Sequence, residues 1–274
     1  MSEECGKESC EGCSEHGCSH RQGPDAANAG SDIKKVIGVI SGKGGVGKST
    51  VCALLAGALK EAGKSCVILD ADITGPSIAK IYGIKDKAGS NGEAVLPAAS
   101  AGGVKVMSIN MLLENETDPV IWRGPIISAT VRQFWTEVAW GSADVMLVDM
   151  PPGTGDVPLT VFQSLPIDGV VVVTTPQELV SMIVEKAVKM AEAMNIPVLG
   201  LVENMSYFDC PDCGKRHEIF GPGRLSETAE RFGVKNTARL PIRPERMALC
   251  DAGRADELKA EELEEFCRQL LMEE

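Results

Sequence analysis

Short apolar runs alternate along this chain with longer segments whose apolar residues recur at helical spacing. The runs at 36–40 and 66–69 are almost free of polar residues, which is typical of strands buried on both faces of a sheet. This alternation predicts a doubly wound α/β fold, with a mainly parallel sheet and helices on both faces. The expected strands are 35–40, 65–70, 104–109, 144–149, 169–174, 197–202 and 237–240, and the expected helices are 48–62, 76–82, 126–139, 178–194, 224–232 and 256–272.

The first 31 residues do not show this alternation. They are rich in Gly, Ser, Glu and Cys and have almost no large apolar side chain, so they cannot fold by burial alone. We expect a cysteine-rich metal- or cluster-binding segment at 1–31, ending in a linker from Gly23 to Ser31, and one globular domain at 32–274. The stretch 85–103, rich in Gly, Ala and Ser, is expected to be a surface excursion.

A glycine-rich segment between the first expected strand and helix fits the phosphate-binding loop pattern G-x-x-x-x-G-K-S/T. Its glycines let the backbone fold round a phosphate, and the N–H groups at the helix N-terminus attract the phosphate charge. Lys48, a candidate catalytic residue, is placed to reach the β- and γ-phosphates, and Ser49 is placed to bind Mg²⁺. The candidate nucleotide ligands are Gly42, Gly44, Gly45, Val46, Gly47, Lys48, Ser49 and Thr50.

Two other expected strands end in carboxylates, at the sheet edge where α/β proteins bind ligands. Asp149 suits a Walker B residue that holds Mg²⁺. Asp72 is a candidate catalytic residue that would orient the attacking water. Gly153 and Gly155 are expected to leave backbone N–H groups free to contact a γ-phosphate. For each acid the simpler alternative is a helix cap or a turn former.

Charge and hydropathy exclude several classes of protein. The net charge is −12, and this argues against a nucleic-acid partner, which needs a basic face. No apolar run reaches the roughly 18 residues of a membrane-spanning helix, and the polar N-terminus does not look like a signal peptide. We therefore expect a cytoplasmic protein with no membrane or nucleic-acid partner.

The ten cysteines are unevenly distributed, and without an export signal close cysteines more often bind metal than form disulfides. Cys52 and Cys66 stand in apolar surroundings and are expected in the core. Cys267 is expected to be structural, and Cys250 is ambiguous. The N-terminal set consists of Cys5, Cys10, Cys13 and Cys18 and has the spacing C-x4-C-x2-C-x4-C. This spacing suits a four-thiolate iron–sulfur cluster or zinc, and a tail without a metal is the alternative.

Another pair, Cys210 and Cys213, stands in a polar stretch. Two thiolates are half of what a tetrahedral zinc or a cubane cluster needs. A symmetric dimer would supply the other half, because a two-fold interface repeats the same patch. Half of a zinc site, a redox dithiol or a plain turn are the alternatives, and His217 is close enough in sequence to be a third ligand.

The phosphate-binding loop carries a second lysine, Lys43, directly after its first glycine. In this it resembles the deviant Walker A loop of the MinD/ParA/nitrogenase iron protein class of dimeric ATPases. Further blocks resemble the Mrp/ApbC-type iron–sulfur cluster carriers over roughly residues 34–242. These blocks are Asp70 to Ser77, Trp122 to Pro125, Asp149 to Asp156, and Glu203 to Ser206 followed by Cys210 to Cys213.

The resemblance implies an ATPase that acts as a homodimer. Lys43 would be catalytic and reach across to the partner's nucleotide, while Asn204 and the neighbourhood of Pro241 would contact adenine. Cys210 and Cys213 of two subunits would share one labile [4Fe-4S] cluster, which the protein would pass to apo iron–sulfur proteins. The implied cofactors are ATP or ADP, Mg²⁺ and the cluster.

The chain departs from the family pattern in three places. The gap before C-x2-C in the N-terminal cysteines is shorter than in the similar set of some eukaryotic relatives. The run from Phe220 to Arg224 lacks one usual glycine, and the segment after Pro241 is degenerate. The alternative functions are a MinD- or ParA-like positioning ATPase, a reductase like the nitrogenase iron protein, and a zinc-binding regulatory ATPase. The acidic C-terminal helix would be repelled by anionic lipid, which disfavours a MinD-like role.

Overall fold

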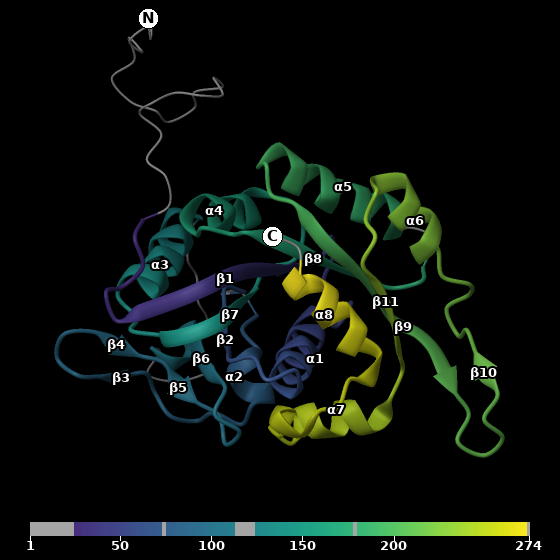
Figure 1. Ribbon diagram of the computed structural model, residues 1–274, viewed down its shortest axis with the longest axis horizontal. Helices are drawn as coiled ribbons and strands as arrows, with labels where there is room; N and C mark the ends of the chain where they lie inside the picture. Colours follow the sequence, from purple (N-terminus) through teal and green to yellow (C-terminus); the bar gives the residue numbers. More distant parts are fainter. Residues whose placement is uncertain (1–24, 73–74, 113–123, 178–179, 273–274) are drawn as a thin grey trace, which may run out of the picture.

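The computed structural model describes residues 25–72, 75–112, 124–177 and 180–272. Within them a nine-stranded sheet runs in the order β10-β9-β8-β1-β7-β2-β6-β5, with β11 also paired to β9 (Figure 1). All pairings in this sheet are parallel except those of β5 and β10 at its margins. The strands are β1 (Ser31–Ile40), β2 (Cys66–Asp70), β5 (Ala98–Ala99), β6 (Lys105–Ser108), β7 (Gly141–Asp149), β8 (Gly169–Thr174), β9 (Val198–Asp209), β10 (Arg216–His217) and β11 (Thr237–Pro241).

Helices cover both faces of the sheet, which confirms the expected doubly wound α/β fold (Figure 1). One face carries α1 (Lys48–Glu61), α2 (Ile78–Ile81), α7 (Pro244–Asp251) and α8 (Glu264–Met272). The other face carries α3 (Gly124–Thr136), α4 (Asp156–Ser164) and α5 (Val180–Ala193), with α6 (Leu225–Phe232) beside α5.

The central strands are apolar because both of their faces are covered. Every residue of β2 and of β8 is buried. Helix α1 packs under β1, β2 and β7 and buries most of its length, including Val51, Leu55 and Leu59. It ends at Gly63, whose φ of 75° only glycine adopts at little cost. This strand–loop–helix unit fixes the position of the phosphate-binding loop.

Two helices were not expected from the sequence, and one expected helix is broken. α4 carries Pro158 and α7 carries Pro244; both prolines lie in a first turn, where no intrahelical N–H bond is lost. The predicted helix 256–272 instead consists of 3₁₀ turns at Ala255–Glu257 and Glu261–Leu263 followed by α8.

The start of the domain also differs from the expected linker. β1 begins at Ser31, and Asn28 just before it hydrogen-bonds to the backbone of α3 at Trp135 and Thr136. The excursion at 85–103 contains a small hairpin of β3 (Gly89–Ser90) and β4 (Val95–Leu96), and then β5. Along the described part of the chain, none of the helices has the length and apolar character needed to cross a bilayer.

Candidate functional site

The phosphate-binding loop joins β1 to α1 at the carboxyl edge of the sheet. Gly45 and Gly47 both adopt φ of 79°, a left-handed conformation that side chains rarely take. A Cβ at Gly47 would overlap the side-chain nitrogen of Asn204, so the loop has room only for glycine there. These two glycines therefore give the loop a shape that other residues would strain.

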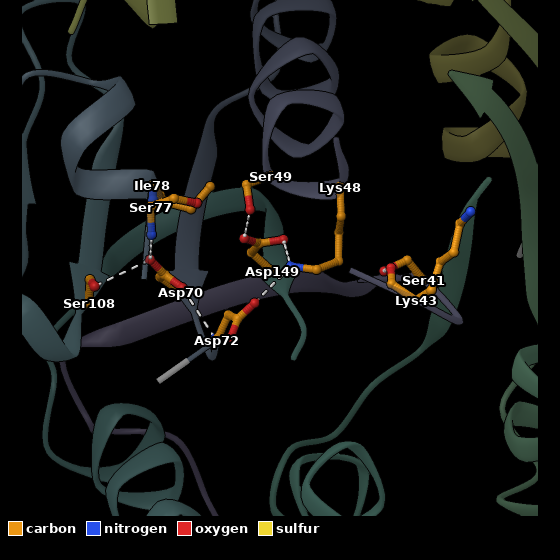
Figure 2. Close-up of polar contacts among 10 residues, drawn as sticks. All are labelled: Ser41, Lys43, Lys48, Ser49, Asp70, Asp72, Ser77, Ile78, Ser108 and Asp149. Atoms are coloured by element: carbon orange, nitrogen blue, oxygen red, sulfur yellow. Dashed lines mark hydrogen bonds and ion pairs between the residues drawn. The ribbon is translucent and has the colours of Figure 1, made fainter. Parts of the chain in front are cut away.

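Lys48 and Ser49, at the start of α1, both contact Asp149 at the end of β7 (Figure 2). Lys48 Nζ donates to Asp149 Oδ1 at 2.6 Å, and Ser49 Oγ donates to Asp149 Oδ2 at 2.6 Å. Lys48 Nζ also lies 3.6 Å from Asp72 Oδ2. The structure thus brings together the predicted lysine, hydroxyl and two carboxylates in one buried cluster.

Burial dominates the electrostatics of this cluster. It raises the pKa of the fully buried Asp149 despite the opposing effect of Lys48 and Ser49. Burial also opposes the charge on Lys48, but the carboxylates of Asp149, Asp72 and Asp70 together outweigh it, so the pKa of the lysine is raised. A hydroxyl and a carboxylate oxygen are hard ligands of the kind that Mg²⁺ prefers, so Ser49 and Asp149 fit a Mg²⁺ site.

Asp70 is a buried residue whose role the sequence left open. It lies opposite Asp149 in the register of β2 and β7. Its carboxylate accepts the backbone N–H groups of Asp72, Ser77 and Ile78 and the hydroxyl of Ser108, at 3.1 to 3.2 Å (Figure 2). Asp70 therefore ties both ends of the segment that follows β2, and this holds Asp72 beside Lys48.

Lys43 and Asn204 connect the loop to the segment after β8 and to β9, respectively. Lys43 Nζ is exposed and donates to Gln177 Oε1, just beyond β8, at 2.8 Å. Asn204 is buried, and its Nδ2 donates to the carbonyl of Val46 at 2.9 Å. Pro241 ends β11 opposite Tyr207 of β9.

Of the two glycines expected to contact a γ-phosphate, Gly153 and Gly155, the first makes a different contact. The N–H of Gly153 donates to the carbonyl of Ser41 at 2.9 Å, so it is not free for a γ-phosphate. The contact instead ties the loop after β7 to the start of the phosphate-binding loop.

Cys210 and Cys213 lie in the turn between β9 and β10, on a hairpin that projects from the body of the molecule (Figure 1). Cys213 is exposed and Cys210 half-buried. The backbone N–H groups of Cys213 and Asp212 point at the Cys210 sulfur and, with the Cys213 thiol, lower the pKa of Cys210. N–H groups directed at a sulfur stabilise the thiolate, the form that binds metal.

The hairpin supplies half of a site. No group of three His, Cys, Asp or Glu side chains suited to a metal occurs among the residues whose placement is described. His217, the alternative third ligand, pairs with Phe208 in the β-ladder and does not complete a site with the two cysteines. The other predicted thiolate set, Cys5, Cys10, Cys13 and Cys18, lies outside the described residues.

The remaining cysteines belong to the core. Cys52, Cys66 and Cys267 are buried, as expected, and burial raises the pKa of each thiol, to about 12 for Cys267. The ambiguous Cys250 is also buried, and burial raises its pKa although the Thr50 hydroxyl hydrogen-bonds to its sulfur.

A polar network between the nucleotide loop and the hairpin was missed from the sequence. Arg239 of β11 donates to Ser206 Oγ at 2.6 Å, to Glu203 Oε1 at 3.2 Å and to Glu218 at 2.9 Å. Ser206 Oγ donates to the buried Glu203 at 2.5 Å, a contact across three positions of one strand. A φ of 55° at Met205 breaks the strand alternation and allows it.

Only one part of this network had a sequence signal: an acid, Glu203, inside an apolar strand. Near the hairpin, Arg216 forms a two-bond ion pair with Asp209, at 2.8 and 3.2 Å. The Arg216 guanidinium also stacks 3.6 Å from the ring centre of Tyr207. The hairpin is thereby fixed to β9 and β11.

Residues 32–272 match a ParA-class family model described as the NUBPL iron-transfer P-loop NTPase. An iron–sulfur cluster carrier protein of Clostridium perfringens is 44% identical over 264 residues, covering 93% of each chain. One of Methanocaldococcus jannaschii is 48% identical over 214 residues, covering 77% of this chain and 74% of the relative.

Solved structures agree with this match. One is a nucleotide-binding protein from Archaeoglobus fulgidus, solved in complex with ADP and described as containing cobalt. It has a TM-score of 0.78 and 45% sequence identity, and the match covers 85% of this chain and 92% of that chain. The MinD cell division protein of Aquifex aeolicus has a TM-score of 0.59 and 18% identity, covering 88% of this chain and 98% of its own, which shows the shared fold. The chain belongs to the iron–sulfur cluster carrier family of ParA-class P-loop NTPases.

Proposed function

We propose that this protein binds and slowly hydrolyses ATP, and that it carries a labile [4Fe-4S] cluster between two copies of itself for transfer to apo iron–sulfur proteins. Membership of the carrier family supports the transfer role in general. The single observation that carries the specific proposal is the exposed Cys210–Cys213 hairpin, a half-site with no third ligand in the part of the chain described.

The nucleotide half of the proposal rests on the buried cluster at the phosphate-binding loop. Lys48 Nζ would leave Asp149 for the β- and γ-phosphates, and the freed carboxylate would join Ser49 in holding Mg²⁺. When bound, Mg²⁺ neutralises charge on the phosphate oxygens. Asp72, whose backbone N–H donates to Asp70, would orient the attacking water.

The remaining site residues follow from the family resemblance. Lys43, whose Nζ donates to Gln177 within its own subunit, would reach the nucleotide of the other subunit. Asn204 and the region of Pro241 would border the adenine. The N-terminal cysteines would hold a second cluster or zinc, and we place the protein in the cytoplasm.

A dimer would link nucleotide binding to cluster binding. Two hairpins related by a two-fold axis would supply four thiolates, as a cubane cluster needs. Nucleotide would control cluster release only if ATP and ADP states favour different dimer arrangements, since a ligand shifts an equilibrium only by its differential affinity.

Iron and labile-sulfide analysis after anaerobic reconstitution tests this proposal. We expect one cluster per two subunits on the hairpins, lost in the double variant Cys210→Ser/Cys213→Ser. The matched control replaces Cys5, Cys10, Cys13 and Cys18 by serine and should keep that cluster. Zinc without sulfide in the wild type, or full cluster content in the hairpin variant, would sink the proposal.

A further inference from the structure

We infer that Ile219 and Phe220 form the apolar contact by which a second copy of this chain packs beside the shared cluster. The inference rests on the proposed function, because it assumes that two hairpins meet. Both side chains lie in a turn directly after β10, closed by the N–H of Gly221 on the carbonyl of Glu218 at 3.0 Å. Ile219 is 57% exposed and Phe220 is 40% exposed.

The turn is held firmly. Glu218 at its start is paired with Arg239 at 2.9 Å, and Arg239 is anchored to the buried Glu203. Beyond the turn, Gly223 packs so closely on the Glu203 carboxylate that a Cβ would overlap it. The apolar pair is therefore presented along β9, between the Cys210 hairpin and Asn204 at the nucleotide loop.

Two adjacent large apolar side chains, fixed and solvent-exposed, need a partner more than scattered ones do. Aromatic residues of this kind are enriched at the centres of interfaces. A client protein is an alternative occupant, but the half-site favours a second copy. Ile219 and Phe220 follow Cys213 by six and seven positions. If the hairpins meet at a two-fold axis, these residues are brought near the same residues of the partner.

The charges around the turn are also suited to self-association. A two-fold interface places like charges opposite each other, and this disfavours a patch of one sign. Here Arg216 is paired with Asp209, and Arg239 with Glu203 and Glu218, within the subunit. Packing of the apolar pair against its counterpart would shield the cluster from water, and this would slow its loss.

The test compares Ile219→Ser/Phe220→Ser with Met272→Ser in the full-length protein. Met272 is 75% exposed but lies beside Lys34 and Lys35, at the opposite edge of the sheet from the nucleotide loop. After anaerobic reconstitution we would measure the dimer fraction by sedimentation velocity and the rate of iron loss to a chelator. We expect the double variant to bind ATP normally, lose most of its dimer and release iron at least tenfold faster, with Met272→Ser unchanged.

A photo-cross-linking amino acid at position 220 gives an independent readout. We expect a cross-linked dimer in the cluster-loaded protein and none when the same group stands at position 272. A double variant with wild-type dimer fraction and iron loss, or no subunit cross-link from position 220, would overturn the inference. A wild type that binds no shared cluster would instead show that the proposed function is wrong.

Discussion

The side-chain nitrogen of Asn204 occupies the place that a Cβ atom would take at Gly47. Asn204 comes from β9, on the far side of the loop, and fixes the loop by donating to the Val46 carbonyl. The strand that ends in the cysteine hairpin is thus in direct contact with the phosphate-binding loop. A single strand, β9, therefore contacts the phosphate-binding loop and leads to the cysteine hairpin.

Gly47→Ala should therefore destabilise the protein even without nucleotide. The left-handed φ and the clash with Asn204 together should lower the free energy of unfolding by about 2 kcal/mol or more. Gly44→Ala is the matched control, because a Cβ there meets nothing within 4 Å and its φ is not in the left-handed region. Urea unfolding of both variants would decide; equal stability of the two would contradict the packing argument.

Removing the charge of Lys48 should lower the free energy of unfolding, because the buried carboxylate of Asp149 loses its ion-pair partner. Lys48→Met leaves the fully buried Asp149 without its cation, and we expect a loss of about 3 kcal/mol in the absence of nucleotide. The double variant Lys48→Met/Asp149→Asn should regain much of this stability while still failing to bind ATP. Unfolding by urea, together with nucleotide titration, measures both effects. A double variant no more stable than Lys48→Met would argue against a buried ion pair.

Lys43 should matter for turnover more than for binding. Lys43→Ala should keep ATP affinity within a few-fold and lose most ATP hydrolysis, if the lysine acts on the partner's nucleotide. The control is Gln177→Ala, which removes the contact of Lys43 within its own subunit and leaves the lysine in place. Steady-state phosphate release separates them. Unchanged turnover in Lys43→Ala would refute the role across the dimer.

Arg239, Glu203 and Ser206, which are hydrogen-bonded to one another at β9, should contribute to stability cooperatively. Arg239→Met would leave the buried Glu203 with the Ser206 hydroxyl as its remaining side-chain partner among the described residues, and we expect a loss of about 2 kcal/mol. Glu203→Gln in the same chain should recover part of it, giving a coupling energy of about 1 kcal/mol or more in a double-mutant cycle. Additive losses, measured by urea unfolding, would mean that the two side chains act independently.

Local patterns predicted the parts of this molecule that depend on neighbours in sequence. The phosphate loop, the burial of β2 and β8 and the acid at Asp149 all follow from period and spacing. What could not be predicted depends on contacts between distant residues. The partners of Asp70 come from two later segments, and Arg239 reaches Glu203 only because β11 lies beside β9.

The secondary-structure predictions that were wrong also have local causes. Helices α4 and α7 were not predicted; each carries a proline, Pro158 or Pro244, in its first turn, where a helix tolerates proline. The apolar run ends at Val202 and is followed by Glu203 and Asn204, so the predicted strand stops there, whereas β9 continues to Asp209. Extending the strand places Cys210 directly at its end.

Acid should destabilise the folded protein by protonating Asp144, which lies at the edge of the sheet away from the phosphate-binding loop. This carboxylate, at the start of β7, accepts Lys34 Nζ at 2.7 Å and the N–H and hydroxyl of Ser65 at 2.9 and 2.8 Å. These bonds hold the pKa of Asp144 well below its ordinary value. Asp144→Asn should therefore lower the thermal midpoint at neutral pH, because an amide replaces one acceptor oxygen with a donor.

The sign of the pH dependence follows from proton binding. Because the pKa of Asp144 is lower in the folded state, the unfolded chain binds more protons as the pH falls, and acid favours unfolding. The contribution is fully present above about pH 4, the ordinary range of an aspartate, and disappears as pH drops through the folded pKa. The thermal midpoints of wild type and Asp144→Asn should therefore differ at pH 7, and the difference should narrow steadily as the pH falls below about pH 4. Asp32→Asn, which loses one long contact of 3.4 Å with Ser142 on the same surface, should follow the wild type throughout. A gap between wild type and Asp144→Asn that stays constant down to pH 3 would show that Asp144 acts by packing and not by charge.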